Sequence, residues 1–168
     1  MRSVQITGTG QLLELSRRLK AAGGPRLKQN LARRIRRAAE PLRDDLQSTV
    51  RGLAISSQGR RQGSRGGPSP TTRPLRATIA AAIRISVRTS GGAGARVWVD
   101  RDALPPDLRN MAATLNTGRI RHPVFGNRRR WVQQTTTPLW WETTIRRHTP
   151  RMTAEVARVL DDVRDQLT

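Results

Sequence analysis

The sequence contains no cysteine, and aromatic residues make up only 3% of its 168 residues. The lack of cysteine excludes a disulfide framework, thiolate catalysis, cysteine-bound zinc and iron–sulfur clusters. No apolar stretch approaches the roughly 18 residues of a membrane-spanning helix, and the first ten residues lack the apolar centre of a signal peptide. We therefore expect a soluble protein that acts without export and without a membrane partner.

Large aliphatic side chains are also scarce. Leu, Ile, Val and Phe total 35 residues, whereas 32 Lys and Arg oppose 12 Asp and Glu, which gives a net charge of +20. A chain with this composition lies near the limit for burying a core of its own. We expect a single domain over 1–168, with a modest core and surfaces that partners complete.

The positive charge resides almost entirely in arginine, which supplies 30 of the 32 basic residues. Residues 1–76 carry a net charge of +13 and residues 77–168 a net charge of +7. A GC-rich genome would also favour arginine over lysine, but it would not produce the net charge. A field of this size attracts nucleic acids or acidic protein surfaces and accelerates association with them.

Periodicity in the first half predicts a short strand and two helices. Val4 and Ile6 alternate with polar neighbours over 2–6, and leucines at helical spacing follow up to residue 19. Apolar residues then recur every three or four positions over 26–55, which predicts a long helix that Pro41 kinks or divides.

The second half alternates predicted hairpins and helices. Alternation over 79–87 and 95–99 indicates a hairpin that turns at 91–94, and a second hairpin is expected over 120–134. A helix is expected over 102–115, and two more begin at Thr137-Pro138 and Thr149-Pro150. This order predicts an α+β fold, in which a small, mostly antiparallel sheet is packed by the long N-terminal helix and a C-terminal helix.

Residues 56–76 contain only Gly, Pro, Ser, Thr, Gln and Arg apart from Leu75. Such a segment has nothing to bury, so we expect an extended basic loop that is mobile in the isolated chain. It is either a passive linker or a segment that a partner orders.

Catalytic or metal-binding residues are few. His122 precedes a proline in an apolar stretch and is expected to be structural, whereas His148 lies between two predicted helices and is expected to be solvated. Asp161 and Asp165 lie one helical turn apart, but no histidine or second carboxylate cluster accompanies them. We expect a protein that is not an enzyme and that needs no metal or cofactor.

Arginine clusters on the long helix, in the basic loop and at the second hairpin are candidate contacts for DNA or an acidic partner. They are Arg33, Arg34, Arg36, Arg37, Arg60, Arg61, Arg65, Arg128, Arg129 and Arg130, although each cluster is equally interpretable as a solvated surface. Candidate interface residues are Trp98, His122, Pro123, Phe125, Trp131, Trp140 and Trp141. No zinc-finger, RRM or KH signature supports sequence-specific recognition.

Four short motifs, in this order, resemble those of the neck or tail-completion proteins of long-tailed bacteriophages, the gene-product-ten-like family. They are Val4–Gly8 before a leucine-patterned helix, the long helix followed by Pro70–Ile79, Asn116–Gly118 with His122–Gly126, and a Thr-Pro-x-Trp sequence at 137–140. The sequence departs from the family at Arg73, where the family usually has glycine.

The resemblance implies a structural virion protein. Such a subunit forms a homo-oligomeric ring, of six copies, between the capsid connector and the tail tube, and genomic DNA passes through its lumen. Its partners would be neighbouring neck and tail-tube proteins, and it would reside in the virion after assembly in the host cytoplasm. The alternative function is a nucleoid- or ribosome-associated basic protein that binds nucleic acid without sequence preference.

Overall fold

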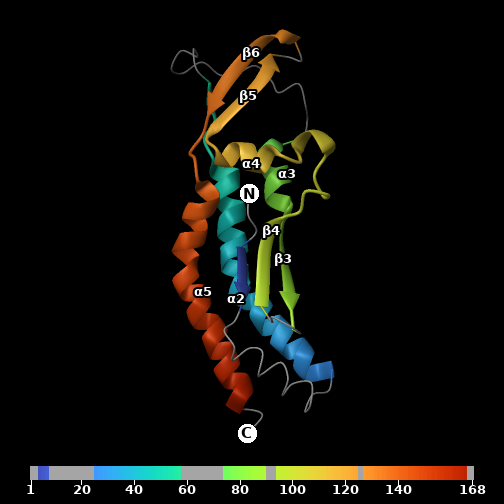
Figure 1. The fold of residues 1–168 in the computed structure, drawn as a ribbon, viewed down its shortest axis with the longest axis vertical. Helices are drawn as coiled ribbons and strands as arrows, with labels where there is room; N and C mark the ends of the chain where they lie inside the picture. The colour runs from blue at the N-terminus through green and yellow to red at the C-terminus, as the bar shows by residue number, and fades with distance from the viewer. Residues whose placement is uncertain (1–3, 8–24, 58–73, 90–93, 125–126, 166–168) are drawn as a thin grey trace.

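A long central helix, α2 (Pro25–Gly52), organises the structure. The computed structural model describes residues 4–7, 25–57, 74–89, 94–124 and 127–165. These residues form an elongated body in which α2 lies between a small sheet and the C-terminal helix α5 (Trp140–Asp165) (Figure 1). The predicted α+β class, with antiparallel strands and long N- and C-terminal helices, is confirmed.

The packing of α2 explains why it is a single helix. Leu31, Ile35, Leu42, Leu46 and Val50 are each at most 1% exposed, and they form one stripe on the helix. Proline at position 41 removes one backbone hydrogen bond but does not divide the helix. The buried residues on both sides of this proline belong to one core cluster, and their burial outweighs the lost bond.

The first sheet packs against α2. It has three strands, β1 (Val4–Thr7), β4 (Gly94–Val99) and β3 (Ile83–Arg88), which are antiparallel in the order β1-β4-β3. The predicted hairpin is confirmed over 83–99, and the N-terminal strand, for which no partner was predicted, pairs with β4.

The prediction that a strand begins at Ile79 is wrong. Residues Leu75–Ala81 form helix α3, which buries Ile79 and Ala80, and β3 begins only at Ile83. Pro74 precedes the helix, and its carbonyl accepts a hydrogen bond from the Thr78 amide at 2.9 Å. Pro74 is the extended residue that precedes the helix, and the alternation seen in the sequence holds only over β3, from Ile83 onward.

The C-terminal helix is likewise continuous, although two helices were expected. α5 passes through Pro150 without ending. Met152, Val156 and Val159, beyond the proline, are buried and extend the apolar stripe of the helix. Packing of α5 along α2 therefore overrides the proline, as it does at Pro41.

A second sheet forms one end of the molecule, where the sequence predicted a single sheet. Its strands are β2 (Ser56–Ser57), β6 (Asn127–Thr135) and β5 (Arg119–Val124), antiparallel in the order β2-β6-β5. A 3-10 helix η1 (Pro106–Leu108) and a short helix α4 (Met111–Asn116), in place of the single helix expected over 102–115, lead into β5 (Figure 1).

The predicted basic loop is shorter than 56–76. Ser56 pairs with Thr135 and Ser57 with Gln134 of β6, and residues 75–76 begin α3. Residues 58–73 and the helix expected before residue 20 lie outside the described residues.

Candidate polyanion interface

The second sheet is attached to the body through Asn116, at the end of α4. The Asn116 Oδ1 accepts a hydrogen bond from the Trp141 amide at 3.0 Å, and its Nδ2 donates to Glu142 Oε2 at 2.8 Å. The Asn116 carbonyl also accepts from the Leu139 amide at 2.9 Å. The Asn116 side chain therefore satisfies one amide of the first turn of α5 and links that turn to the end of α4.

Gly118 completes this attachment. Its φ of +78° lies in the left-handed region, and its carbonyl accepts a hydrogen bond from the Thr136 amide at 3.0 Å. A Cβ at this position would lie 2.9 Å from Pro138 Cβ, so only glycine fits without a shift. We call the contacts among Asn116, Gly118, Thr136, Leu139 and Trp141 the joint.

Beyond the joint, β5 and β6 form a projecting hairpin, which we call the ribbon (Figure 1). Ile120, at its base, is the one residue of the ribbon that is buried within its described part. Every residue from Asn127 to Trp131 is exposed. A hairpin with so little buried surface is marginally stable when isolated.

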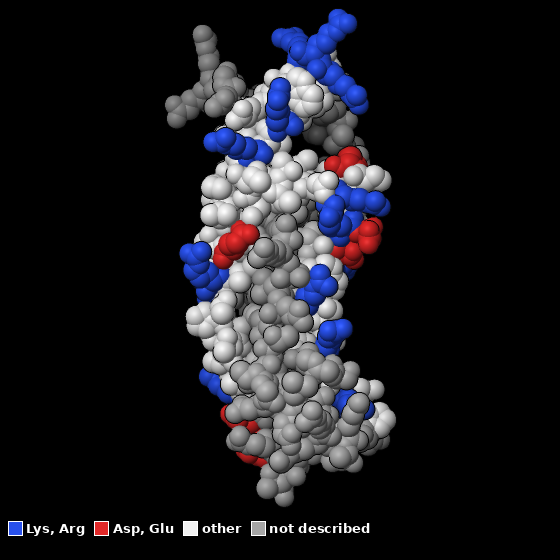
Figure 2. Space-filling view, in the orientation of Figure 1, with Lys and Arg blue, Asp and Glu red and all other residues white. Residues whose placement is uncertain are grey.

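Three arginines lie together in a bulge of the ribbon. Pairing shifts between Pro123 and Val124, so that Pro123 opposes Trp131 whereas Val124 opposes Asn127. Residues 128–130 therefore have no partner in register on β5. A bulge re-aims side chains away from the regular pleat, and Figure 2 shows basic side chains gathered at this end of the molecule.

Acidic residues are missing from the sequence around the ribbon. Residues 108–141 contain no Asp or Glu and include six arginines. Residues 46–99, which contain β2 and the first sheet's hairpin, also contain no Asp or Glu. The arginines of the ribbon therefore have no acidic neighbour within this stretch of the sequence.

Two of the α2 arginines that were expected to contact DNA or an acidic partner make polar contacts within the chain instead. Arg34 forms an ion pair with Asp162 of α5, and Arg33 donates a hydrogen bond to Asn30 on its own helix. Arg36 and Arg37 are exposed. A hydrogen bond to Asp44 raises the pKa of Arg43, the next arginine along the helix. Arg60, Arg61 and Arg65 lie outside the described residues.

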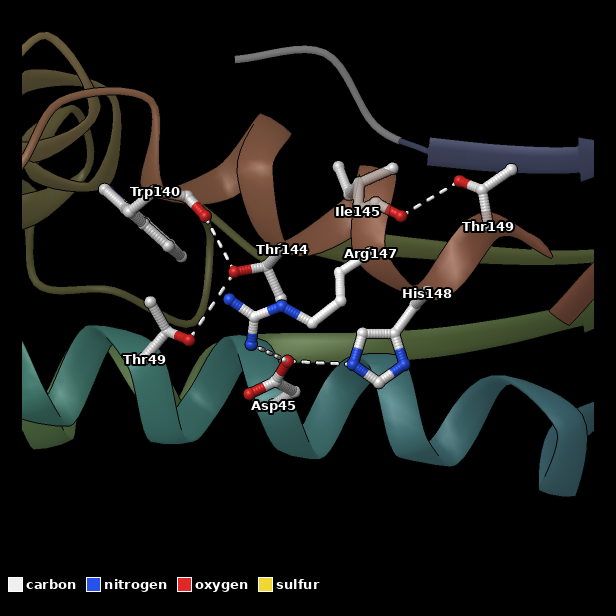
Figure 3. A network of polar contacts seen from close by, with 8 residues as sticks. All are labelled: Asp45, Thr49, Trp140, Thr144, Ile145, Arg147, His148 and Thr149. Atoms are coloured by element: carbon white, nitrogen blue, oxygen red, sulfur yellow. Dashed lines mark hydrogen bonds and ion pairs between the residues drawn. The ribbon is translucent and has the colours of Figure 1, made fainter. Parts of the chain in front are cut away.

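His148 is not solvated, contrary to expectation. Its Nε2 lies 2.8 Å from Asp45 Oδ2, to which the Arg147 guanidinium also donates at 3.3 Å (Figure 3). One helical turn along, the hydroxyls of Thr49 and Thr144 lie 3.5 Å apart. Among the described residues the imidazole has no other polar partner, so the pair holds α5 against α2.

A groove of about 350 Å³ lies between the same two helices. Arg34, Arg37, Arg151, His148 and Glu155 line it, together with apolar residues of both helices. Two of its arginines, at 37 and 151, form no ion pair within the described part of the chain.

The candidate interface tryptophans divide into core and surface. Trp140 and Trp141 are 2% exposed and contact each other edge to face at 5.7 Å, so the expectation that they form an interface is wrong. Trp98 is half-buried beneath the Arg96 guanidinium, 5.4 Å from the ring centroid. Trp131 is 49% exposed.

The other candidate interface residues lie at the ribbon. His122 and Pro123 are half-buried on β5, and the imidazole Nδ1 lies 3.1 Å from the Pro123 carbonyl. Phe125 lies outside the described residues. The sequence predicted the ribbon's arginines but gave no sign of the bulge that groups them.

No cluster of three or more His, Asp or Glu residues that could hold a metal ion occurs in the described part of the chain. Asp162, which lies between Asp161 and Asp165 in the sequence, pairs with Arg34. None of the described helices combines the length and apolarity needed to cross a membrane.

Comparisons of this chain with protein families, with curated proteins and with solved structures found no match.

Proposed function

We propose that the chain is a structural subunit of a tailed-phage virion that forms a ring at the neck, between the capsid connector and the tail tube. The resemblance of four ordered motifs supports this proposal. Two of them, Asn116–Gly118 and the Thr-Pro-x-Trp sequence at 137–140, contact each other at the joint. These motifs therefore act as one structural unit, which favours a shared architecture over chance similarity.

The ribbon is the observation that carries the proposal. It is fixed at its base by the joint, buries little of its own surface and presents residues 127–131 to the outside. An element of this kind gains its stability from a neighbour. In a head-to-tail ring, each ribbon would contact the adjacent copy, a tail-tube protein or the DNA in the lumen.

Quantitative mass spectrometry and cryo-electron microscopy of particles from the producing cell test this function. The expected result is a fixed copy number that is a multiple of the tail symmetry, most simply six, at the neck. A matched variant replaces residues 122–132 with an Asn-Gly turn and leaves the joint intact. It should fold but fail to enter particles. A single copy per particle, or none in purified particles, would contradict the proposal.

The second candidate function is non-specific nucleic-acid binding by a basic protein. The arginine-rich ribbon, with no acidic residue over 108–141, favours it. A neck subunit must let the genome slide past, so we expect weak duplex binding at physiological salt, with a Kd of about 10⁻⁴ to 10⁻⁶ M. Nanomolar duplex binding at physiological salt without sequence preference would make this second function the first.

A further inference from the structure

Trp131 is the one exposed aromatic side chain among the described residues. Its indole is nevertheless held in place. The Nε1 donates a hydrogen bond to the Arg128 carbonyl at 2.8 Å, and the Arg121 guanidinium lies 5.0 Å from the ring centroid. An indole fixed in this way loses little conformational entropy when a ligand packs on it.

The register of the ribbon explains this geometry. Trp131 opposes Pro123, and Arg121 opposes Gln133, so the arginine lies diagonally across from the tryptophan on the same face. This contact leaves half of the tryptophan surface open. The bulge places the guanidiniums of residues 128–130 next to it in the chain, all of them exposed.

We infer that the ribbon is a binding site for single-stranded nucleic acid, in which one base stacks on Trp131 and the neighbouring phosphates bind the arginines of the bulge. The inference rests on the second candidate function in one respect, that the ribbon binds polyanions. It does not depend on ring formation.

The chemistry of the site favours a single strand over a duplex. A fixed, open aromatic face flanked by cations is the combination by which proteins hold unpaired bases. In a duplex the bases are stacked on one another, so the arginines would find phosphates but the indole would find no base. An acidic peptide would neutralise the arginines and leave the tryptophan without a flat partner.

Fluorescence anisotropy with the full chain tests the inference. The probes are a labelled oligothymidylate and a labelled duplex hairpin with the same number of phosphates. Wild-type protein should bind the single strand more tightly. Trp131→Ala should weaken single-strand binding by about 5- to 150-fold and leave duplex binding nearly unchanged, whereas Trp131→Phe should retain most of the affinity. Trp98→Ala, which removes the other arginine-contacted tryptophan, is the matched control and should change neither.

Each result has a distinct meaning. If neither nucleic acid binds even at low salt, both the inference and the second candidate function fail. If both bind equally and Trp131→Ala has no effect, the ribbon binds phosphates alone, and only the inference fails. Competition by polyglutamate as effective as that by unlabelled oligothymidylate would also overturn it, in favour of an acidic protein. Quenching of tryptophan fluorescence by oligothymidylate in the wild type, lost in Trp131→Ala, would confirm stacking directly.

Discussion

Replacing Gly118 with alanine tests the joint that fixes the ribbon to the body. The glycine has a φ of +78° and is buried. Its amide donates to the Leu115 carbonyl at 3.1 Å, and its carbonyl accepts from Thr136. An added Cβ would meet Pro138 Cβ at 2.9 Å and the Thr136 carbonyl oxygen at 3.1 Å. The substitution therefore combines backbone strain with crowding against a proline ring.

The two effects set the expected magnitude. A non-glycine residue in the left-handed conformation costs about 1–2 kcal/mol, and overpacking at a close contact costs about 1–3 kcal/mol. Gly118→Ala should therefore lower the free energy of unfolding by about 2–5 kcal/mol. That loss is a large fraction of the roughly 5–15 kcal/mol that stabilises a typical domain, and each kcal/mol lowers the Tm by about 2–4 °C at this size.

Urea denaturation followed by circular dichroism measures this loss. Gly52→Ala is the matched control, because nothing lies within 4 Å of a Cβ added there and the residue ends α2. That control should be neutral or slightly stabilising, by up to about 1 kcal/mol. A Gly118→Ala variant whose free energy of unfolding stays within about 0.5 kcal/mol of the wild type would contradict this prediction, since neither the strain nor the close contact would then exist.

Three further predictions concern other parts of the structure. Leu139 has a φ of +55° and is 56% exposed, so Leu139→Gly should raise the free energy of unfolding by up to about 1 kcal/mol in thermal melts; a clear loss would contradict the strain. Asp45→Asn should cost about 1–2 kcal/mol, and a double-mutant cycle with His148→Gln should show coupling rather than additivity. Replacing residues 128–130 with glutamine should reduce the log–log salt slope of duplex binding by up to about 2.7; an unchanged slope would show that the bulge touches no phosphate.

Elements with a long, regular pattern could be predicted from the sequence. The helix predicted over 26–55 and observed over Pro25–Gly52 carries one apolar stripe from Leu31 to Val50, and a regular pattern of this length favours a helix over a strand. Short segments could not be predicted as well, because a few residues fit more than one periodic pattern. Ile79 fits both an alternating strand and a helix that buries two adjacent residues, and its local pattern does not distinguish the two.

Tertiary contacts explain the remaining errors. The sequence marks Pro41 and Pro150 as helix breaks, but it does not reveal that two long helices pack along each other and hold both together. Asp45 and His148 are 103 residues apart, and Arg34 and Asp162 are 128 apart, so no local spacing could connect them. The arginine triplet of the ribbon could be predicted, whereas the bulge and the fixed indole depend on a register shift between strands.

The ion pairs change where the partner-binding charge is expected to lie. By net charge alone, the first half of the chain is the electrostatic surface, and α2 is its centre. Yet Arg34 and Arg43 of α2 are paired with aspartates, and Asp45 is shared by Arg147 and His148 of α5. On the ribbon no acidic residue competes for the arginines. Ion pairs between α2 and α5 stabilise the packing of the two long helices, whereas the arginines at 128–130 of the ribbon are exposed to solvent. Substitutions on the ribbon should therefore alter binding without changing stability, and substitutions along the α2–α5 contact should do the reverse.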